Sequence, residues 1–151
     1  MIFKVEEHVQ INQGEVIYSK DDLSFDFEPI QNSDCTLLIG YINLTFDSET
    51  KLACQVWGYN DINTWISREL VKPNSIKGRL YLEDGIDAGE NIRLIDAGVW
   101  TTYFDKNSGW VCIGNDKIED NDFSVEFAKN TIAVTNQNRL KALWLKPYFI
   151  Q

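Results

Sequence analysis

The sequence contains a single histidine, His8, and this shortage argues against several kinds of active site. A cupin-like metal centre or a three-histidine zinc site needs several histidines in one chain. A Ser-His-Asp or Cys-His hydrolase would have to use His8, close to the beginning of the sequence, as its base. We therefore predict no metal ion and no other cofactor, and we expect His8 to be a surface residue.

Cysteines and long apolar runs are also scarce. Cys35, Cys54 and Cys112 are odd in number and widely spaced, and no two of them form a CxxC pair, so we expect reduced thiols in a cytoplasmic protein. No stretch approaches the roughly 18 apolar residues of a membrane span. The first ten residues, MIFKVEEHVQ, lack the basic and apolar regions of a signal peptide. The glycine spacings of Walker and dinucleotide loops do not occur either.

Basic residues are outnumbered by acidic ones, 14 against 23, which gives a formal net charge of −9. All of the acids precede Lys129, and from Lys129 onward the chain has four basic residues and no acid. Because phosphates repel an acidic surface, we expect no direct binding of nucleic acid. The excess of carboxylates either keeps the protein soluble or marks a surface for a basic protein partner.

The sequence is rich in short stretches in which apolar and polar residues alternate between turn signals. Phe123, Val125 and Phe127 form one example, and Leu23, Phe25 and Phe27, stopped by Pro29, form another. About nine or ten such stretches predict an all-β, mainly antiparallel fold. We expect a single β-rich domain over residues 1–151, built as a β-sandwich or a partly open barrel.

One segment has a different period. Ile62, Trp65, Ile66 and Leu70 recur at steps of three or four residues, before Pro73. With Asn60 or Asp61 as the N-cap, this spacing predicts one short helix near residues 61–70. An alternating strand from Thr64 to Leu70 is the other interpretation, since so short a run fits both patterns.

The most informative stretch is Thr36 to Tyr59, which predicts one long antiparallel hairpin closed at residues 47–51. Pairing Leu44 with Cys54 and Ile42 with Val56 places the apolar rows on one face. The opposite face then carries rings and amides: Tyr41, Asn43, Gln55, Trp57 and Tyr59. Either another layer of the protein covers this face, or it is a binding surface on which the rings supply contact area and the amides supply orientation.

A second aromatic hairpin is predicted from Val99–Phe104 and Trp110–Gly114, around a five-residue connection. Pairing Phe104 with Trp110 places Trp100, Phe104, Trp110 and Cys112 on one side, and Tyr103, Val111 and Ile113 on the other. Since both sides are apolar, this hairpin is either central in a sandwich or covered by a partner. Trp100 and Trp110 are therefore further candidates for ligand contacts.

Acidic residues are concentrated in two loops, EDGIDAGEN at 83–91 and NDKIEDND at 115–122. The spacing in the first loop is not that of an EF-hand, so we interpret both as solvated turns rather than calcium sites. Their carboxylates are candidate contacts for a basic protein: Asp84, Asp87, Glu90, Asp116, Glu119, Asp120 and Asp122.

Three functions are compatible with these features. The first is a non-enzymatic inhibitor of another protein, of the kind that acts as an immunity or anti-defence protein in bacteria or phages, binding a basic surface through the acidic loops. The alternative is a β-sandwich module that binds a small ligand or a carbohydrate through its aromatic face. The third is a glycoside hydrolase with a pair of carboxylates, for which Glu126 and Asp96 lie on strand-like segments.

Overall fold

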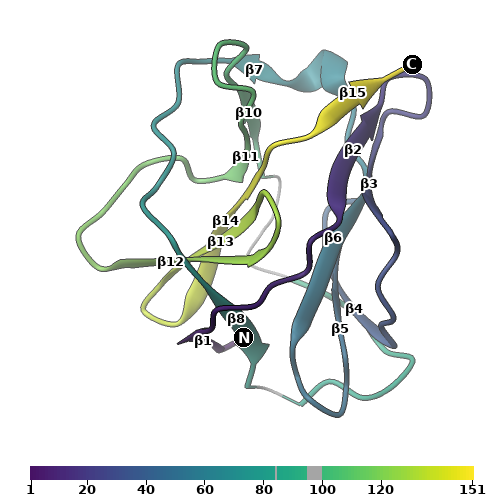
Figure 1. Cartoon of the computed structure of the whole chain (residues 1–151), viewed down its shortest axis with the longest axis vertical. Helices are drawn as coiled ribbons and strands as arrows, with labels where there is room; N and C mark the ends of the chain where they lie inside the picture. Colours follow the sequence, from purple (N-terminus) through teal and green to yellow (C-terminus); the bar gives the residue numbers. More distant parts are fainter. Residues whose placement is uncertain (84, 95–99) are drawn as a thin grey trace.

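The computed structural model describes residues 1–83, 85–94 and 100–151. The described chain forms two mixed β-sheets packed face to face, so the predicted all-β sandwich is confirmed (Figure 1). The strands are β1 (Phe3–Glu7), β2 (Glu15–Ser19), β3 (Ser24–Glu28), β4 (Cys35–Ile39), β5 (Ile42–Phe46), β6 (Ala53–Tyr59), β7 (Ile66–Ser67), β8 (Ile76–Leu82), β9 (Asn91–Arg93), β10 (Thr102–Phe104), β11 (Val111–Gly114), β12 (Asp122–Ala128), β13 (Thr131–Asn136), β14 (Arg139–Leu145) and β15 (Tyr148–Ile150). Many of these strands are short, which is why sequence alternation predicted a smaller number.

The eight-stranded sheet has the order β1-β8-β12-β13-β14-β11-β10-β7, and the seven-stranded sheet has the order β15-β2-β3-β6-β5-β4-β9. Most neighbours are antiparallel. The parallel pairs are β8 with β12 inside the eight-stranded sheet, and the pairs by which β7, β9 and β15 join their sheets at the edges. Apolar side chains from the inner faces of both sheets form the main core, with Phe25, Phe46, Leu80 and Val125 among its fully buried members. Burial of these alternating residues is what holds the two layers together.

The helix predicted near residues 61–70 is reduced to one 3-10 turn, Ile62–Thr64, capped by the Asp61 carboxylate. Trp65 then returns to an extended backbone, and β7 follows, so the strand interpretation also holds only in part. The reason is tertiary: the Trp65 ring stacks on Phe25 at 5.6 Å, and its indole nitrogen donates to the Asn60 Oδ1 atom at 2.8 Å. These contacts outweigh the weak local preference for helix.

The long hairpin predicted over residues 36–59 is a three-stranded meander, β4-β5-β6. The chain turns at Gly40, whose φ of 61° favours glycine, so residues 40 and 41 form a turn rather than part of a strand. The predicted pairing of Leu44 with Cys54 is wrong, since Leu44 lies opposite Val56. An irregularity between Thr45 and Phe46 shifts the register, a change that alternation alone does not reveal.

The second aromatic hairpin has its pairing shifted by one residue. Phe104 lies opposite Val111, not Trp110. Trp110 therefore shares the outer side of the sheet with Cys112 and Tyr103, and the two predicted sides are partly exchanged, because a shift of one residue reverses the facing of a strand. Val99, where this hairpin was expected to begin, lies outside the described residues.

The outer faces of the two sheets differ. The connection from β7 to β8 runs along the outside of the eight-stranded sheet (Figure 1), where Leu70 packs on Trp110 and Trp144 in a second apolar cluster. The outer face of the seven-stranded sheet carries no comparable cluster of buried residues in the part of the chain that the structure describes. Among the described residues, no helix has the length and apolarity needed to cross a bilayer.

Candidate functional site

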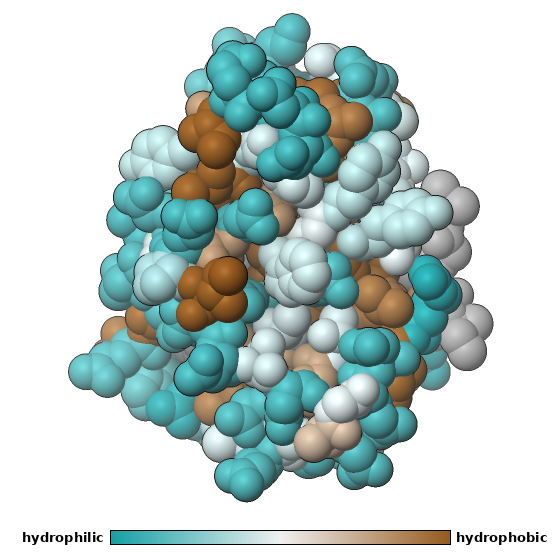
Figure 2. All heavy atoms as spheres, turned by 90° about the vertical axis from the view of Figure 1, so that its right-hand side faces the viewer, coloured by the Kyte–Doolittle hydropathy of each residue, from teal (hydrophilic) through white to brown (hydrophobic). Residues whose placement is uncertain are grey.

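The outer face of the seven-stranded sheet presents large aromatic side chains to solvent. Tyr41 is 74% exposed, Tyr59 46% and Trp57 42%. Figure 2 looks onto this side of the molecule, where near-white and brown side chains gather in the middle and hydrophilic ones surround them. The expectation that another layer covers these rings is therefore wrong. We refer to Tyr41, Asn43, Trp57 and Tyr59 as the aromatic face.

Strand geometry explains why these residues share one side. Val56 points into the core, so Trp57 and Tyr59, at alternate positions on β6, point outward. Asn43 lies opposite Trp57 on β5, and Tyr41 occupies the turn before that strand. The Tyr41 and Tyr59 rings meet edge to face with centroids 5.8 Å apart. The aromatic face is thus built on paired strands, which hold it more rigidly than a loop would.

The two amides expected on this face have different surroundings. The Asn43 Nδ2 atom donates to the carbonyl oxygens of Tyr41 at 3.5 Å and Trp57 at 3.4 Å, so it braces the face while staying partly exposed. Gln55 is buried, and its side chain pairs with the backbone of Gln31 in both directions. Gln55 therefore fastens the loop after β3 and does not present its amide to solvent.

A hollow of about 390 Å³ adjoins Trp57 at the side of the aromatic face nearest β3. The residues that line it include Asp26, with its carboxylate, and Ile30, whose aliphatic side chain is exposed. Sequence analysis overlooked Asp26. The alternation of Phe25 and Phe27 placed it on an outward face, but only the pairing of β3 with β6 brings it to Trp57.

A second groove, of about 580 Å³, opens between the two sheets on the other side of Tyr59. It brings together three of the candidate ligand-binding rings, Tyr41, Tyr59 and Trp100. Hydroxyl, amide and carboxyl groups also line it, from residues Asn60, Asp61, Thr64, Thr101 and Thr102. Its volume lies in the range typical of small-ligand sites.

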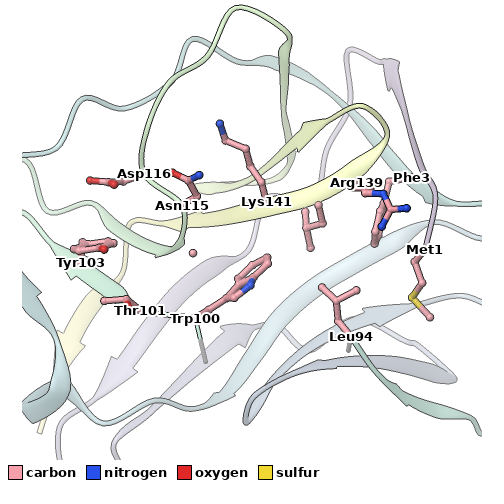
Figure 3. A pocket seen from close by; sticks show the side chains of 12 residues that line it. Met1, Phe3, Leu94, Trp100, Thr101, Tyr103, Asn115, Asp116, Arg139 and Lys141 are labelled. Atoms are coloured by element: carbon pink, nitrogen blue, oxygen red, sulfur yellow. The ribbon is translucent and has the colours of Figure 1, made fainter. Parts of the chain in front are cut away.

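Trp100 also lines a third cavity, of about 490 Å³ (Figure 3). In this view the indole ring lies between Leu94 and Met1 on one side and Thr101 and Tyr103 on the other. Trp110, the remaining candidate ring, is buried on the outer side of the eight-stranded sheet, with the Lys72 ammonium 5.6 Å from its ring centroid. Trp110 is therefore separated from the other candidate rings.

The structure places the two acidic loops on different sides of the molecule (Figure 1). In the first loop, the Asp87 amide donates to the Glu90 carboxylate at 2.7 Å, and Asp84 lies outside the described residues. In the second loop, Asp116 pairs with Arg68 at 2.9 Å. A partner that touched both loops at once would have to reach across the protein.

Lys141 holds the second acidic loop, residues 115–122, in place through ion pairs and a hydrogen bond. Its ammonium contacts the carboxylates of Asp122 at 2.7 Å and Glu119 at 3.1 Å, and it donates to the Lys117 carbonyl oxygen. Burial alone would raise the pKa of Asp122, but the hydrogen bonds from Lys141 and Asn136 lower it overall. Asp120 is exposed, and its carboxylate has no hydrogen-bond or ion-pair partner within the described ranges.

The candidate catalytic groups that the structure describes, a carboxylate and the thiols, have surroundings that do not favour catalysis. Glu126 accepts a hydrogen bond from the Asn130 amide at 2.9 Å and so supports a turn, and Asp96 lies outside the described residues. Burial raises the pKa of Cys35 and of Cys54 to about 11, which keeps these thiols protonated at neutral pH. The residues that the structure describes contain no group of three or more His, Cys, Asp or Glu side chains that could hold a metal ion.

No family model matches the chain, and no curated protein sequence matches it. The candidate site therefore has to be interpreted from its own geometry.

Proposed function

We propose that this chain is a non-enzymatic protein-binding module of the inhibitor type, and that it contacts its partner through the aromatic face. The observation that carries the proposal is the exposure of Trp57, Tyr59 and Tyr41 on a rigid sheet that no described segment covers. Tryptophan and tyrosine dominate the binding energy of many protein interfaces, because each buries a large area at a small cost in conformational entropy.

The acidic residues around the aromatic face support the proposal of a partner with a basic surface. Three carboxylates lie along the side of the aromatic face formed by β3 and its preceding turn: Asp22, Asp26 and Glu28. Asp61 lies next to Tyr59 in the groove on the opposite side. Together with the net charge of −9, these acids favour encounter with a positively charged surface. In this proposal the two acidic loops contribute to long-range attraction, and the rings contribute most of the contact energy.

The proposal is tested by hydroxyl-radical footprinting of the protein in complex with a partner captured from a lysate of its own source. We expect binding to protect Tyr41, Trp57 and Tyr59 from oxidation. Phe123 is 67% exposed on the other sheet and should stay reactive, which makes it an internal control. Unchanged oxidation of the three rings, with protection only at residues 85–90 or 115–122, would move the interface to the acidic loops and contradict the proposal.

A second candidate function, binding of a small ligand or carbohydrate, is favoured by the groove between Tyr41, Tyr59 and Trp100. Rings of this kind stack on the apolar faces of sugars, while the surrounding hydroxyl and amide groups would orient them. We expect a sugar that binds there to change the fluorescence of Trp100 at millimolar concentration, and Tyr59→Ala to abolish the change. An unchanged tryptophan spectrum across a broad panel of sugars and nucleotides would argue against this function.

A further inference from the structure

The hollow beside Trp57 combines a carboxylate with an aromatic wall. Asp26 on β3 and Trp57 on β6 line it from neighbouring strands, and Ile30 adds an exposed aliphatic side chain. At about 390 Å³ the cavity is large enough for one long side chain. A carboxylate beside an aromatic ring and an aliphatic side chain suits a cation that is carried on an apolar stem.

The Asp26 carboxylate has no hydrogen-bond or ion-pair partner in the part of the chain that the structure describes, although several acids on the other side of the molecule do. Asp116, Glu119 and Asp122 are each paired with a basic residue. Partial burial, followed by the nearby charges of Glu28 and Asp22, raises the pKa of Asp26 above its ordinary value. The fold thus holds an uncompensated negative charge at this position, which a bound cation would relieve.

Trp57 also lacks the cation that accompanies comparable rings elsewhere in the molecule. Lys72 lies over Trp110, and Lys20 lies over Phe149 at 5.9 Å. No described Lys or Arg lies over Trp57 in this way. Its ring is therefore open to a cation from outside the chain.

The protein itself contains the arrangement that would complete this hollow. On the other sheet, the Arg68 guanidinium lies 4.1 Å from the centroid of the Tyr103 ring and pairs with the Asp116 carboxylate at 2.9 Å. One planar cation thus satisfies a ring and a carboxylate together. The hollow at Trp57 has the ring and the carboxylate but not the cation.

We propose that the hollow between Trp57 and Asp26 accepts an arginine side chain of the protein partner, with the guanidinium stacked on the indole and paired with the carboxylate. This inference rests on the proposed function and specifies the chemistry of its partner. Arginine fits better than lysine, because its planar group stacks on rings, is weakly hydrated and can donate two hydrogen bonds to one carboxylate. The exposed aliphatic side chain of Ile30 suits the methylene part of the arginine.

The test uses the peptide acetyl-Gly-Arg-Gly-amide, its lysine version and its citrulline version, in which an uncharged urea replaces the guanidinium. Binding is followed by NMR through the Trp57 indole N–H signal, assigned with Trp57→Phe. We expect the arginine peptide to shift this signal, the lysine peptide to bind more weakly, and the citrulline peptide to bind about tenfold more weakly or not at all.

Two variants with the same change in charge separate local from general electrostatics. Asp26→Asn should lower the affinity for the arginine peptide about three- to tenfold. Asp120→Asn, on the other side of the molecule, should change that affinity less than twofold. Because the raised pKa shows that the fold disfavours the charged form of Asp26, Asp26→Asn should also raise the thermal midpoint at pH 7. This gain should fade as the pH falls through the pKa of Asp26 and the native carboxyl becomes protonated.

Equal binding of the arginine and citrulline peptides, no shift of the Trp57 signal, or unchanged affinity in Asp26→Asn would each overturn the inference. These outcomes are separable from failure of the proposed function. If the captured partner protects Trp57 from oxidation but no arginine peptide binds, the interface stands and its cation site is wrong. If the peptide binds but the partner leaves Trp57 unprotected, the hollow stands and the proposed interface is wrong.

Discussion

Replacing Trp57 with alanine should weaken binding of the protein partner by about 30-fold or more, which corresponds to about 2 kcal/mol in binding free energy. Trp57 has Asn43 opposite it on β5 and the Asp26 hollow on its other side, so it lies inside the aromatic face rather than at its edge. Residues in that position are fully desolvated on binding and contribute most to affinity. Tyr41, at the turn and more exposed, should contribute less.

The measurement is the dissociation constant of the captured partner by calorimetry or surface plasmon resonance, with the loss expected mainly in the dissociation rate. Phe123→Ala is the control, because it removes another exposed aromatic ring, from β12 on the other sheet. Both variants should stay folded, since neither ring is buried. A loss below about threefold for Trp57→Ala, or an equal loss for Phe123→Ala, would show that the aromatic face is not the centre of the interface.

The composition of the aromatic face could be predicted from sequence because a strand has a period of two. Counting by twos along one strand groups Trp57 with Tyr59, whatever the pairing of that strand. Their exposure could not be predicted in this way. Whether a layer covers a face depends on where distant segments run, and here the β7 to β8 connection covers the other sheet instead.

The pairing and register of the strands were the features least predictable from the sequence. The register of β5 against β6 depends on an irregularity at Thr45, and the hollow at Trp57 depends on the contact of β6 with β3. Neither has a local signature in the sequence. The same reason explains why the predicted helix does not form over its full length. Residues 62–70 have helical spacing, but the aromatic cluster around Trp65 fixes an extended backbone there.

Gly58→Ala is expected to cost about 2–4 kcal/mol of folding stability, the largest effect of any small substitution near the aromatic face. Gly58 has a φ of 130°, a conformation that side chains rarely adopt. A Cβ atom there would lie 2.4 Å from the Tyr41 carbonyl oxygen and 2.9 Å from Asn43 Nδ2. Because the first of these atoms belongs to the backbone of the turn, the collision cannot be relieved by rotating a side chain.

Gly40→Ala separates the two parts of this cost. Gly40 also has a positive φ, of 61°, but a Cβ atom there would meet nothing within 4 Å. Its substitution should cost only about 1 kcal/mol, from backbone strain alone. Thermal unfolding followed by circular dichroism should therefore show a midpoint lowered by about 2–4 °C for Gly40→Ala and by at least twice as much for Gly58→Ala.

The collision at Gly58 should also change the aromatic face, because the obstructed atom belongs to Tyr41. If the turn moves to admit the new methyl group, Tyr41 and Tyr59 lose their edge-to-face contact, and the oxidation rate of Tyr41 in footprinting should change while that of Phe123 does not. Equal midpoints for Gly58→Ala and Gly40→Ala would mean that the strands relax without strain. In that case the spacing of β5 and β6, and with it the position of Tyr41 on the aromatic face, would not depend on glycine at position 58.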